Sequence, residues 1–235
     1  MTTRLFIIAV TPGIALALGA YLTDRFDREP ISMLIKVFIL GAVSVIPTII
    51  VERLFMSFNI FGGIMKSAYT AFIVAGLVEE YFKREVVLRS VFRSEAFNEK
   101  LDGIIYAVYS ALGFATIENI SYVVFRFAYN PYVGIFRGIL SVPAHMLFAI
   151  TMGYYLSLAK FAEEEKDKRV YLRRSLTVPV IFHGIFDFIL LSGIPFAMII
   201  FVPFVIYLWV VNLRRLNEYY VESKALFKRP NKNNH

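Results

Sequence analysis

The sequence predicts an all-α, polytopic membrane helix bundle with about seven transmembrane helices and a re-entrant or interfacial segment. Composition is the first reason: 58% of the 235 residues are hydrophobic and 18% are charged, with a mean hydropathy of +0.63. An ordinary soluble domain carries ~45–50% apolar and ~25% charged residues. The apolar residues also gather in long stretches, and basic residues cluster between them. We expect one membrane-embedded domain over residues 1–235, ending in a basic cytoplasmic tail over 214–235.

Seven stretches approach the ~20 residues that a helix needs to cross ~30 Å of hydrocarbon. In order, they are Leu5–Leu22, Ile31–Val51, Ser67–Val87, Gly103–Phe125, Ile135–Ala159, Ser175–Ser192 and Pro195–Leu213. The first could instead be a cleaved signal peptide, although its apolar run is longer than the ~7–15 residues typical of such a segment. Asp102 is placed to cap the fourth helix at its N-terminus.

The third stretch is the least apolar of the seven. Its uncharged part, Ser67–Val78, covers only ~18 Å at ~1.5 Å per residue, which is too short to cross the membrane. The helix must therefore continue to Val87, which places Glu79 and Glu80 inside the membrane. The preceding segment, Phe58–Met65, is then expected to be re-entrant or interfacial.

The basic residues predict the topology. Nineteen of the 25 Lys and Arg residues fall in the connections and tail on one side of the seven spans, and four fall on the other side. The positive-inside rule assigns the richer side to the cytoplasm, so the N-terminus is outside and the C-terminus is inside. The net charge of +7 then reflects topology and contact with anionic lipid, and no nucleic-acid partner is expected.

A small set of ionisable side chains lies within the predicted spans, away from their ends. They are Glu79, Glu80, Glu118, His145, His183 and Asp187. A carboxylate at the centre of a bilayer costs ~2.5–3.5 kcal/mol, so several isolated ones would be strongly unfavourable. We therefore expect these side chains to form one polar cluster facing a water-filled cavity inside the bundle.

The alternative is that each ionisable group is only paired structurally along its own helix. The i,i+4 spacing allows three such pairs: Glu79–Lys83, Glu80–Arg84 and His183–Asp187. Neighbouring helix residues point ~100° apart, so Glu79 and Glu80 are not expected to aim at the same atom, and only one of them is expected to face the cavity. The other would support it through Lys83 or Arg84. Glu and His together can act as a general acid/base set near neutral pH, with Asp187 fixing the tautomer of His183.

Several known hydrolase motifs are missing from the sequence. There is no cysteine, which excludes a cysteine nucleophile and thiolate metal ligands. There is no His-Glu-x-x-His zinc motif and no Gly-x-Ser-x-Gly nucleophile motif. There is also no Gly-x-Gly-Asp, which argues against an aspartyl intramembrane protease. A Glu/His site inside the membrane remains.

Three ordered motifs resemble the PrsW family of bacterial intramembrane proteases, which is related to the CAAX-processing prenyl endopeptidases. Glu79-Glu80-Tyr81-Phe82-Lys83 matches E-E-x-x-K, Phe114-Ala115-Thr116-Ile117-Glu118-Asn119 matches F-A-x-x-E-N, and His183-Gly184-Ile185-Phe186-Asp187 matches H-x-x-x-D. Asp102-Gly103-Ile104-Ile105-Tyr106 and the lone His145 are also similar to that family. The likeness extends from about Asp24 to Phe188.

The resemblance implies a multi-pass endopeptidase of the plasma membrane. It implies a membrane-spanning protein substrate, namely an anti-sigma factor that receives its first, site-1 cut near the outer face. By similarity, Glu79 would be the base that activates water, and Glu80 would be its required neighbour. His183 would stabilise the oxyanion, and Asp187 would orient His183.

No cofactor is expected, with zinc kept as an alternative, because Glu, His and Asp are all potential metal ligands. Cations within one helical turn of Glu79 and Glu80 would compete with a divalent ion. Two other functions stay open: an ion-coupled transporter or proton relay, and a non-catalytic membrane scaffold. One difficulty is geometric, because Glu79 lies about two helical turns from the predicted cytoplasmic boundary, far from an outer cleavage site.

Overall fold

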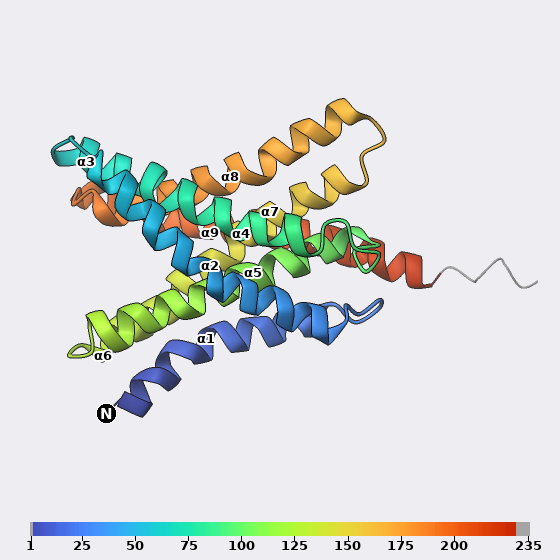
Figure 1. Cartoon of the computed structure of the whole chain (residues 1–235), viewed down its shortest axis with the longest axis horizontal. Helices are drawn as coiled ribbons and strands as arrows, with labels where there is room; N and C mark the ends of the chain where they lie inside the picture. Colours follow the sequence, from blue (N-terminus) through green and yellow to red (C-terminus); the bar gives the residue numbers. More distant parts are fainter. Residues whose placement is uncertain (1, 229–235) are drawn as a thin grey trace, which may run out of the picture.

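The computed structural model describes residues 2–228, and within this range the chain is helical and contains no strand. The long helices run roughly along one direction and form a bundle (Figure 1). In chain order, the elements are α1 (Thr2–Thr23), α2 (Ile31–Ser57), α3 (Gly63–Tyr69), η1 (Thr70–Leu77), α4 (Val78–Ser90), α5 (Lys100–Ile120), η2 (Ser121–Arg126), α6 (Pro131–Ile139), α7 (Ser141–Lys160), α8 (Glu165–Leu191) and α9 (Pro195–Phe227). The polytopic helical bundle that the sequence predicts is confirmed.

Six helical segments within the described residues are long and apolar enough to cross a membrane. The seventh predicted span corresponds to the continuous helical segment α3–η1–α4, whose charged residues set it apart from the other six. The N-terminal end of α1 and the C-terminal end of α9 lie at opposite ends of the bundle (Figure 1). This placement agrees with an odd number of crossings.

The core of the bundle is α5, which packs against α1, α2, α4 and α7. It approaches α7 closely at Gly103 and Gly153. A Cβ atom on Gly153 would lie 2.3 Å from the carbonyl oxygen of Gly103, so neither position has room for a side chain. Small residues allow membrane helices to pack backbone to backbone, where dispersion and close contact stabilise them. The helix that carries Glu118 is thereby held at a fixed depth in the bundle.

Several elements differ in detail from the sequence-based expectation. The segment after α2 is a short connection with exposed apolar side chains, including Phe58 and Ile60, so it suits an interface better than a re-entrant loop. Helix α5 begins at Lys100 with Glu99 as its N-cap, and Asp102, the third residue of the helix, is the N3 partner in the capping box rather than the cap itself. Its side chain accepts hydrogen bonds from the backbone N–H groups of Asn98 and Glu99.

The expected basic tail is not a separate segment over its first part. Helix α9 continues from the membrane through Phe227, and Tyr219 stacks on Tyr154 of α7 with ring centroids 4.9 Å apart. Lys100 also forms an ion pair with Glu222, 2.9 Å between Nζ and Oε1. Both contacts tie this extension to the bundle. The remainder of the tail, residues 229–235, lies outside the described residues.

Four buried carboxyl groups gather at the end of the bundle where α1 ends and α5 begins. They are Asp24, Glu29, Glu99 and Asp102, and each is at most 7% exposed. Glu29 accepts a hydrogen bond from the Tyr106 hydroxyl, and the backbone N–H of Glu29 donates to Asp24 at 2.8 Å. Among residues 2–228, no basic side chain approaches these four carboxyl groups to within 4.0 Å. The cluster therefore lacks the counter-ions that would stabilise its charged form.

Stability is expected to fall with rising pH because of this acidic cluster. Burial raises the pKa of Asp24 to about 6 and that of Glu99 to about 7, and it also raises the pKa of Glu29. Each group then binds protons more readily in the folded state, so the folded state loses stability as pH rises from about 4, the unfolded pKa, to about 7. Glu29→Gln, which keeps an acceptor for Tyr106, should raise the thermal midpoint in detergent by a few degrees at pH 7.5 and weaken its pH dependence.

The matched control for this measurement is Glu218→Gln, which replaces an exposed carboxylate in the C-terminal half of α9. It should leave both the midpoint and its pH dependence unchanged. A midpoint that rises between pH 5 and pH 7.5 in the unmodified protein would contradict the expectation.

Candidate active site

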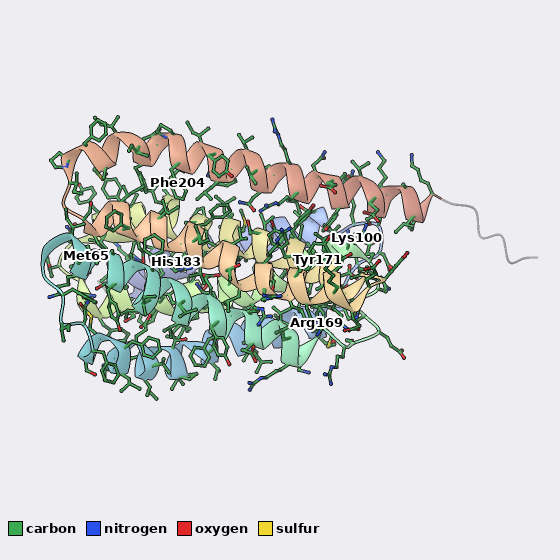
Figure 2. The ribbon with its side chains drawn as sticks, turned by 90° about the horizontal axis from the view of Figure 1, so that it is seen from above. Met65, Lys100, Arg169, Tyr171, His183 and Phe204 are labelled. Carbon is green, nitrogen blue, oxygen red and sulfur yellow. The ribbon has the colours of Figure 1, made fainter. Side chains whose placement is uncertain are left out.

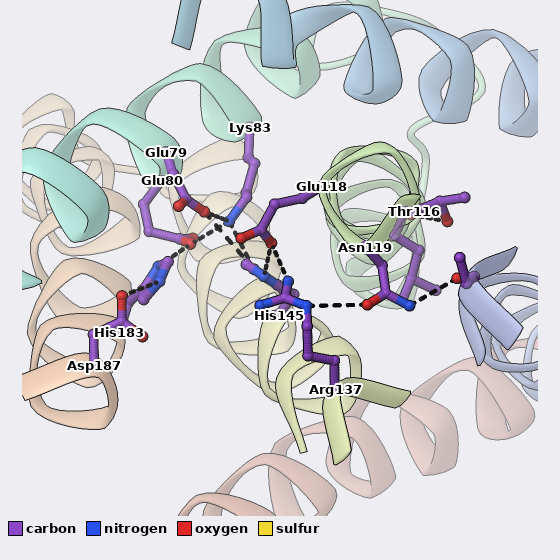
Figure 3. A network of polar contacts seen from close by, with 12 residues as sticks. Glu79, Glu80, Lys83, Thr116, Glu118, Asn119, Arg137, His145, His183 and Asp187 are labelled. Atoms are coloured by element: carbon purple, nitrogen blue, oxygen red, sulfur yellow. Dashed lines mark hydrogen bonds and ion pairs between the residues drawn. The ribbon is translucent and has the colours of Figure 1, made fainter. Parts of the chain in front are cut away.

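The six predicted site residues come from four helices that meet in the bundle. α4 supplies Glu79 and Glu80, α5 supplies Glu118, α7 supplies His145, and α8 supplies His183 and Asp187 (Figure 3). All six belong to one connected polar network rather than to separate pairs within single helices. The predicted polar cluster is therefore present in the structure.

Close packing brings η1 and α8 together next to this network. A Cβ atom on Gly184 would lie 2.2 Å from the Phe72 ring, and one on Gly76 would lie 3.2 Å from the Val180 carbonyl oxygen. The segment η1 is π-helical over Thr70–Leu77 and ends two residues before Glu79. Wide helical turns of this kind are frequent at functional sites. The glycines and the π-helical turn together set how Glu80 faces His183.

The Lys83 ammonium lies at the centre of the network. Its Nζ is 3.0 Å from Glu79 Oε2, 2.8 Å from Glu80 Oε1 and 2.9 Å from His145 Nδ1. An ammonium has three N–H donors, and here each has one acceptor. The side chain of Lys83 is fully buried and lies over the Phe114 ring, 4.4 Å from its centroid. Lys83 therefore holds residues of two helices at fixed positions.

These contacts correct two expectations about the neighbouring glutamates. Glu79 and Glu80 both reach the same atom, Lys83 Nζ, because long side chains at i−4 and i−3 can converge although their Cα–Cβ bonds diverge. The expected pair of Glu80 with Arg84 does not form. Arg84 instead binds α8, where it donates to Ser175 Oγ at 2.8 Å and to the Leu172 carbonyl oxygen at 2.9 Å.

His145 is held in one tautomer by its two partners. Because Lys83 can only donate, Nδ1 of His145 must accept, so the ring proton is on Nε2. Nε2 then donates to Glu118 Oε2 at 2.9 Å. His145 Nδ1 also lies 4.0 Å from Glu79 Oε2. The geometry thus defines a neutral imidazole beside Glu79.

His183 has a carboxylate on each side. Its Nδ1 is 3.0 Å from Glu80 Oε1, and its Nε2 is 3.4 Å from Asp187 Oδ2. Two flanking acceptors favour the imidazolium, in which both nitrogens donate. The ring also stacks on Phe148, with centroids 5.0 Å apart. The contact with Asp187 is longer than a normal hydrogen bond, so Nε2 is the less tightly held nitrogen.

The network extends to residues that the sequence-based reasoning did not assign to the site. Arg137 of α6 lies 3.0 Å from Glu118 Oε2 and donates from Nε to Asn119 Oδ1, also at 3.0 Å. Asn119 in turn donates to the Ala9 carbonyl oxygen of α1 at 2.8 Å. Asn119 is part of the F-A-x-x-E-N pattern, which was the available signal for it. Arg137 offered none beyond being a basic residue near the start of a span.

A cavity of about 570 Å³ opens beside the network. Glu79, Glu118, His145, His183 and Asp187 line it, whereas Glu80 does not and is fully buried. One glutamate of the pair therefore faces the cavity and the other lies behind it, as expected.

The mouth of this cavity lies at one end of the bundle. Its lining includes Met56, Arg126 and Leu191, which lie at or next to the ends of α2, η2 and α8. His183 is on the same side of the bundle as Met65 and far from Arg169 (Figure 2). These helix ends lie on the side predicted to be outside. The cavity therefore connects Glu79 with this end of the bundle, and the expected difficulty does not arise if this end is the outer one.

The same residues can be tested as a metal site. One ligand atom each from Glu79, Glu80, His145 and His183 lies within 4.8 Å of the others, and all four residues are buried. This number and type of donors suit zinc. The Lys83 ammonium, however, lies within 3.0 Å of three of the four residues, so it occupies His145 Nδ1 and one oxygen of each glutamate and places a positive charge where a cation would bind. As arranged, the site does not fit a metal ion.

The chain matches known proteins over most of its length. Residues 29–211 match the family described as "PrsW family intramembrane metalloprotease". Protease PrsW of Clostridioides difficile (strain 630) is 43% identical over 229 residues, covering 97% of this chain and 96% of that protein. Protease PrsW of Bacillus subtilis (strain 168) is 37% identical over 208 residues, covering 88% of this chain and 91% of its own. No solved structure matches the chain.

Proposed function

The chain belongs to the PrsW family of intramembrane proteases, and on that premise we propose that it hydrolyses a peptide bond of a membrane-spanning protein with water activated by Glu79. The observation that carries this proposal is the convergence of Glu79, His145 and His183 from three helices on one cavity. A carboxylate and imidazoles within reach of one another are a competent acid/base set.

Glu79 is the general base in this proposal. Its Oε2 is held by Lys83, and Oε1 has no hydrogen-bond partner among the described residues. Oε1 can therefore accept a proton from a water molecule in the cavity. The resulting hydroxide forms a C–O bond with the scissile carbonyl carbon. When the C–N bond breaks, Glu79 returns the proton to the departing amine, so no other reactant is needed.

His183 stabilises the charge that develops on the carbonyl oxygen. Its Nε2–H is the donor that can turn toward the oxyanion, because the contact with Asp187 is long at 3.4 Å. Glu80 keeps the ring in place through Nδ1. A preorganised donor aimed at a developing oxyanion is worth about 10²–10³ in rate. Asp187 and Glu80 are positioning residues in this scheme.

The proposed reaction is independent of metal and of any other cofactor, although the family is described as one of metalloproteases. Lys83 supplies a fixed positive charge beside Glu79 where a metalloprotease would hold its ion. No step of the scheme passes through a metal. We therefore propose a glutamic-type protease, with catalysis by Glu79 and support from His183.

The proposed substrate is a single-span anti-sigma factor, cut for the first time near its outer face, as the resemblance to the family implies. The position of the cavity supports this part of the proposal. Its mouth is formed at the ends of α2, η2 and α8, which the distribution of basic residues assigns to the outside. A site-1 cut requires this orientation in the plasma membrane.

Reporter fusions should test this orientation. Fusions after Lys168 and at the C-terminus are both expected to report a cytoplasmic location, because 19 of the 25 basic residues lie on that side. A fusion in the connection after η2, at Tyr129, should report the outside. An external signal from either of the first two would overturn the orientation and the outer-face cut together.

Cleavage of a tagged single-span substrate by the wild-type protein and by Glu79→Gln tests the proposed function. The substitution keeps the shape of the side chain and removes the base, so cleavage should fall below detection while the protein still accumulates in the membrane. Glu85→Gln is the control, because Glu85 lies on the same helix but binds Arg89 outside the cavity.

Near-wild-type cleavage by Glu79→Gln would show that the base is assigned wrongly. A transporter or a scaffold of the same fold would give no cleavage with any variant, including the wild-type protein. Failure of Glu79→Gln to accumulate would instead indicate that the network is mainly structural.

A further inference from the structure

Glu52 is an ionisable residue within a membrane span that has no role in the scheme above. It lies on α2 about one and a half turns before the end of the helix at Ser57 and is half-buried. Its side chain lines the active-site cavity together with Glu79, Glu118 and His183. A carboxylate inside a membrane span is costly, and such residues are functional by default.

Glu52 differs from the other glutamates around the cavity in having no partner among the residues that the structure describes. Glu79 and Glu80 bind Lys83, and Glu118 binds both His145 and Arg137. Across residues 2–228, no hydrogen bond and no ion pair involves the Glu52 carboxylate. A carboxylate without a counter-ion in such a position is a ready acceptor for a cation that arrives with a ligand.

The nearby cations are directed at other groups, and none of those described forms an ion pair with Glu52. All three donors of Lys83 are used, and it is fully buried. Arg137 is held by Glu118 and Asn119 and lies 4.0 Å from the centroid of the Tyr122 ring. Arg126, at the mouth, lies over Tyr122 and Phe127. The structure therefore pairs no cation of residues 2–228 with Glu52, and a cation that arrives with a ligand would find this carboxylate unpaired.

We propose that Glu52 is a specificity-determining residue that binds a Lys or Arg side chain of the substrate on the outer side of the scissile bond. This inference rests on the proposed peptidase function of the same cavity. Glu52 lies between Met56 at the mouth and Glu79 deeper in the cavity. The substrate residue that binds Glu52 therefore lies one to two helical turns from the scissile bond, toward the outer end of the substrate span. A substrate with a basic residue there loses less on leaving water, because its charge is neutralised in the cavity.

The test uses the full chain in liposomes and a set of model polypeptides as probes. Each probe is one Leu/Ala membrane span whose outer flank carries Lys, Gln or Glu at successive positions over the first two turns. The wild-type protein should cleave the best Lys probe at least about tenfold faster than its Gln counterpart. Glu52→Gln should remove this preference, and Glu52→Lys should reverse it in favour of the Glu probes. Arg53→Gln, an exposed neighbour outside the cavity, should keep the wild-type order.

Binding to the inactive Glu79→Gln protein distinguishes the role of Glu52 from the proposed peptidase function. It is measured as the photo-crosslinking yield of the same probes. If the Glu79→Gln protein prefers the Lys probes and the Glu79→Gln/Glu52→Gln double variant does not, the role of Glu52 is supported even where no probe is cleaved. Absence of cleavage by the wild-type protein would in that case count against the peptidase function alone. Cleavage or binding with the same order of probes in the presence and absence of Glu52 overturns the inference and leaves the peptidase function standing. Absence of both cleavage and binding for all probes would overturn both.

Discussion

Lys83→Met is expected to reduce cleavage by at least about 10³-fold, the largest effect of any single substitution outside Glu79. Methionine matches lysine in length but offers no N–H donor. Without the ammonium, Glu79 and Glu80 face each other as two buried carboxylates without a common cation, so one of them will take up a proton or turn away. Either change removes the base from its position. The measurement is the single-turnover rate with the tagged substrate in liposomes.

The same substitution should change the response of the protein to zinc. With Lys83 replaced, Glu79, Glu80 and His145 lose their shared hydrogen-bond partner, and together with His183 they still offer ligand atoms within 4.8 Å of one another. Lys83→Met should therefore bind about one zinc ion per chain, measured by elemental analysis after dialysis. The wild-type protein should hold well under one and should stay active in a strong chelator.

The control for both measurements is Arg89→Met, on the exposed face of the same helix, which should behave as the wild-type protein. Zinc bound stoichiometrically by the wild-type protein, with activity lost to a chelator and restored by zinc alone, would contradict this account. Lys83 would then have to leave the centre of the cluster in the active state, and His145 and His183 would be ligands.

The fold and the members of the site follow from the sequence for different reasons. Apolar stretches near the length of a membrane crossing can be recognised in the sequence as spans, because the thickness of the bilayer imposes that length on every span. The cost of burying charge then predicts that ionisable residues such as Glu79, Glu118 and His183 gather in one place. That argument works for the set, since it needs no knowledge of which helices are neighbours.

The internal geometry of the site could not be predicted in the same way. Helical periodicity describes the direction of the Cα–Cβ bond, so it could not show that Glu79 and Glu80 converge on Lys83 through their long side chains. Arg137 and Glu52 line the cavity because helices distant in the sequence pack together. That packing depends on contacts such as Gly184 against Phe72. Motif spacing within one helix contains no information about such contacts.

His183→Ala is expected to reduce cleavage by about 10³-fold, whereas Asp187→Ala should reduce it by only about tenfold. The difference follows from the two contacts of the imidazole. Glu80 holds Nδ1 at 3.0 Å from a fully buried position, while Asp187 is partly exposed and 3.4 Å from Nε2. Removal of Asp187 leaves the ring anchored by Glu80 and its stacking on Phe148. The rates are measured with the tagged substrate at matched protein levels.

Asp187→Asn tests whether Asp187 acts through its charge or through its position. Asparagine keeps an acceptor for Nε2–H but removes the second negative charge beside the ring, so the imidazolium loses part of its stabilisation. If charge matters, Asp187→Asn should resemble Asp187→Ala in rate and should show its loss mainly in kcat, because the oxyanion forms only in the transition state. A loss confined to KM would instead place Asp187, which lines the cavity, in contact with the bound substrate. Equal and complete loss in His183→Ala and Asp187→Ala would mean that Glu80 alone cannot hold the ring, and that the long contact in the structure is the one that positions His183.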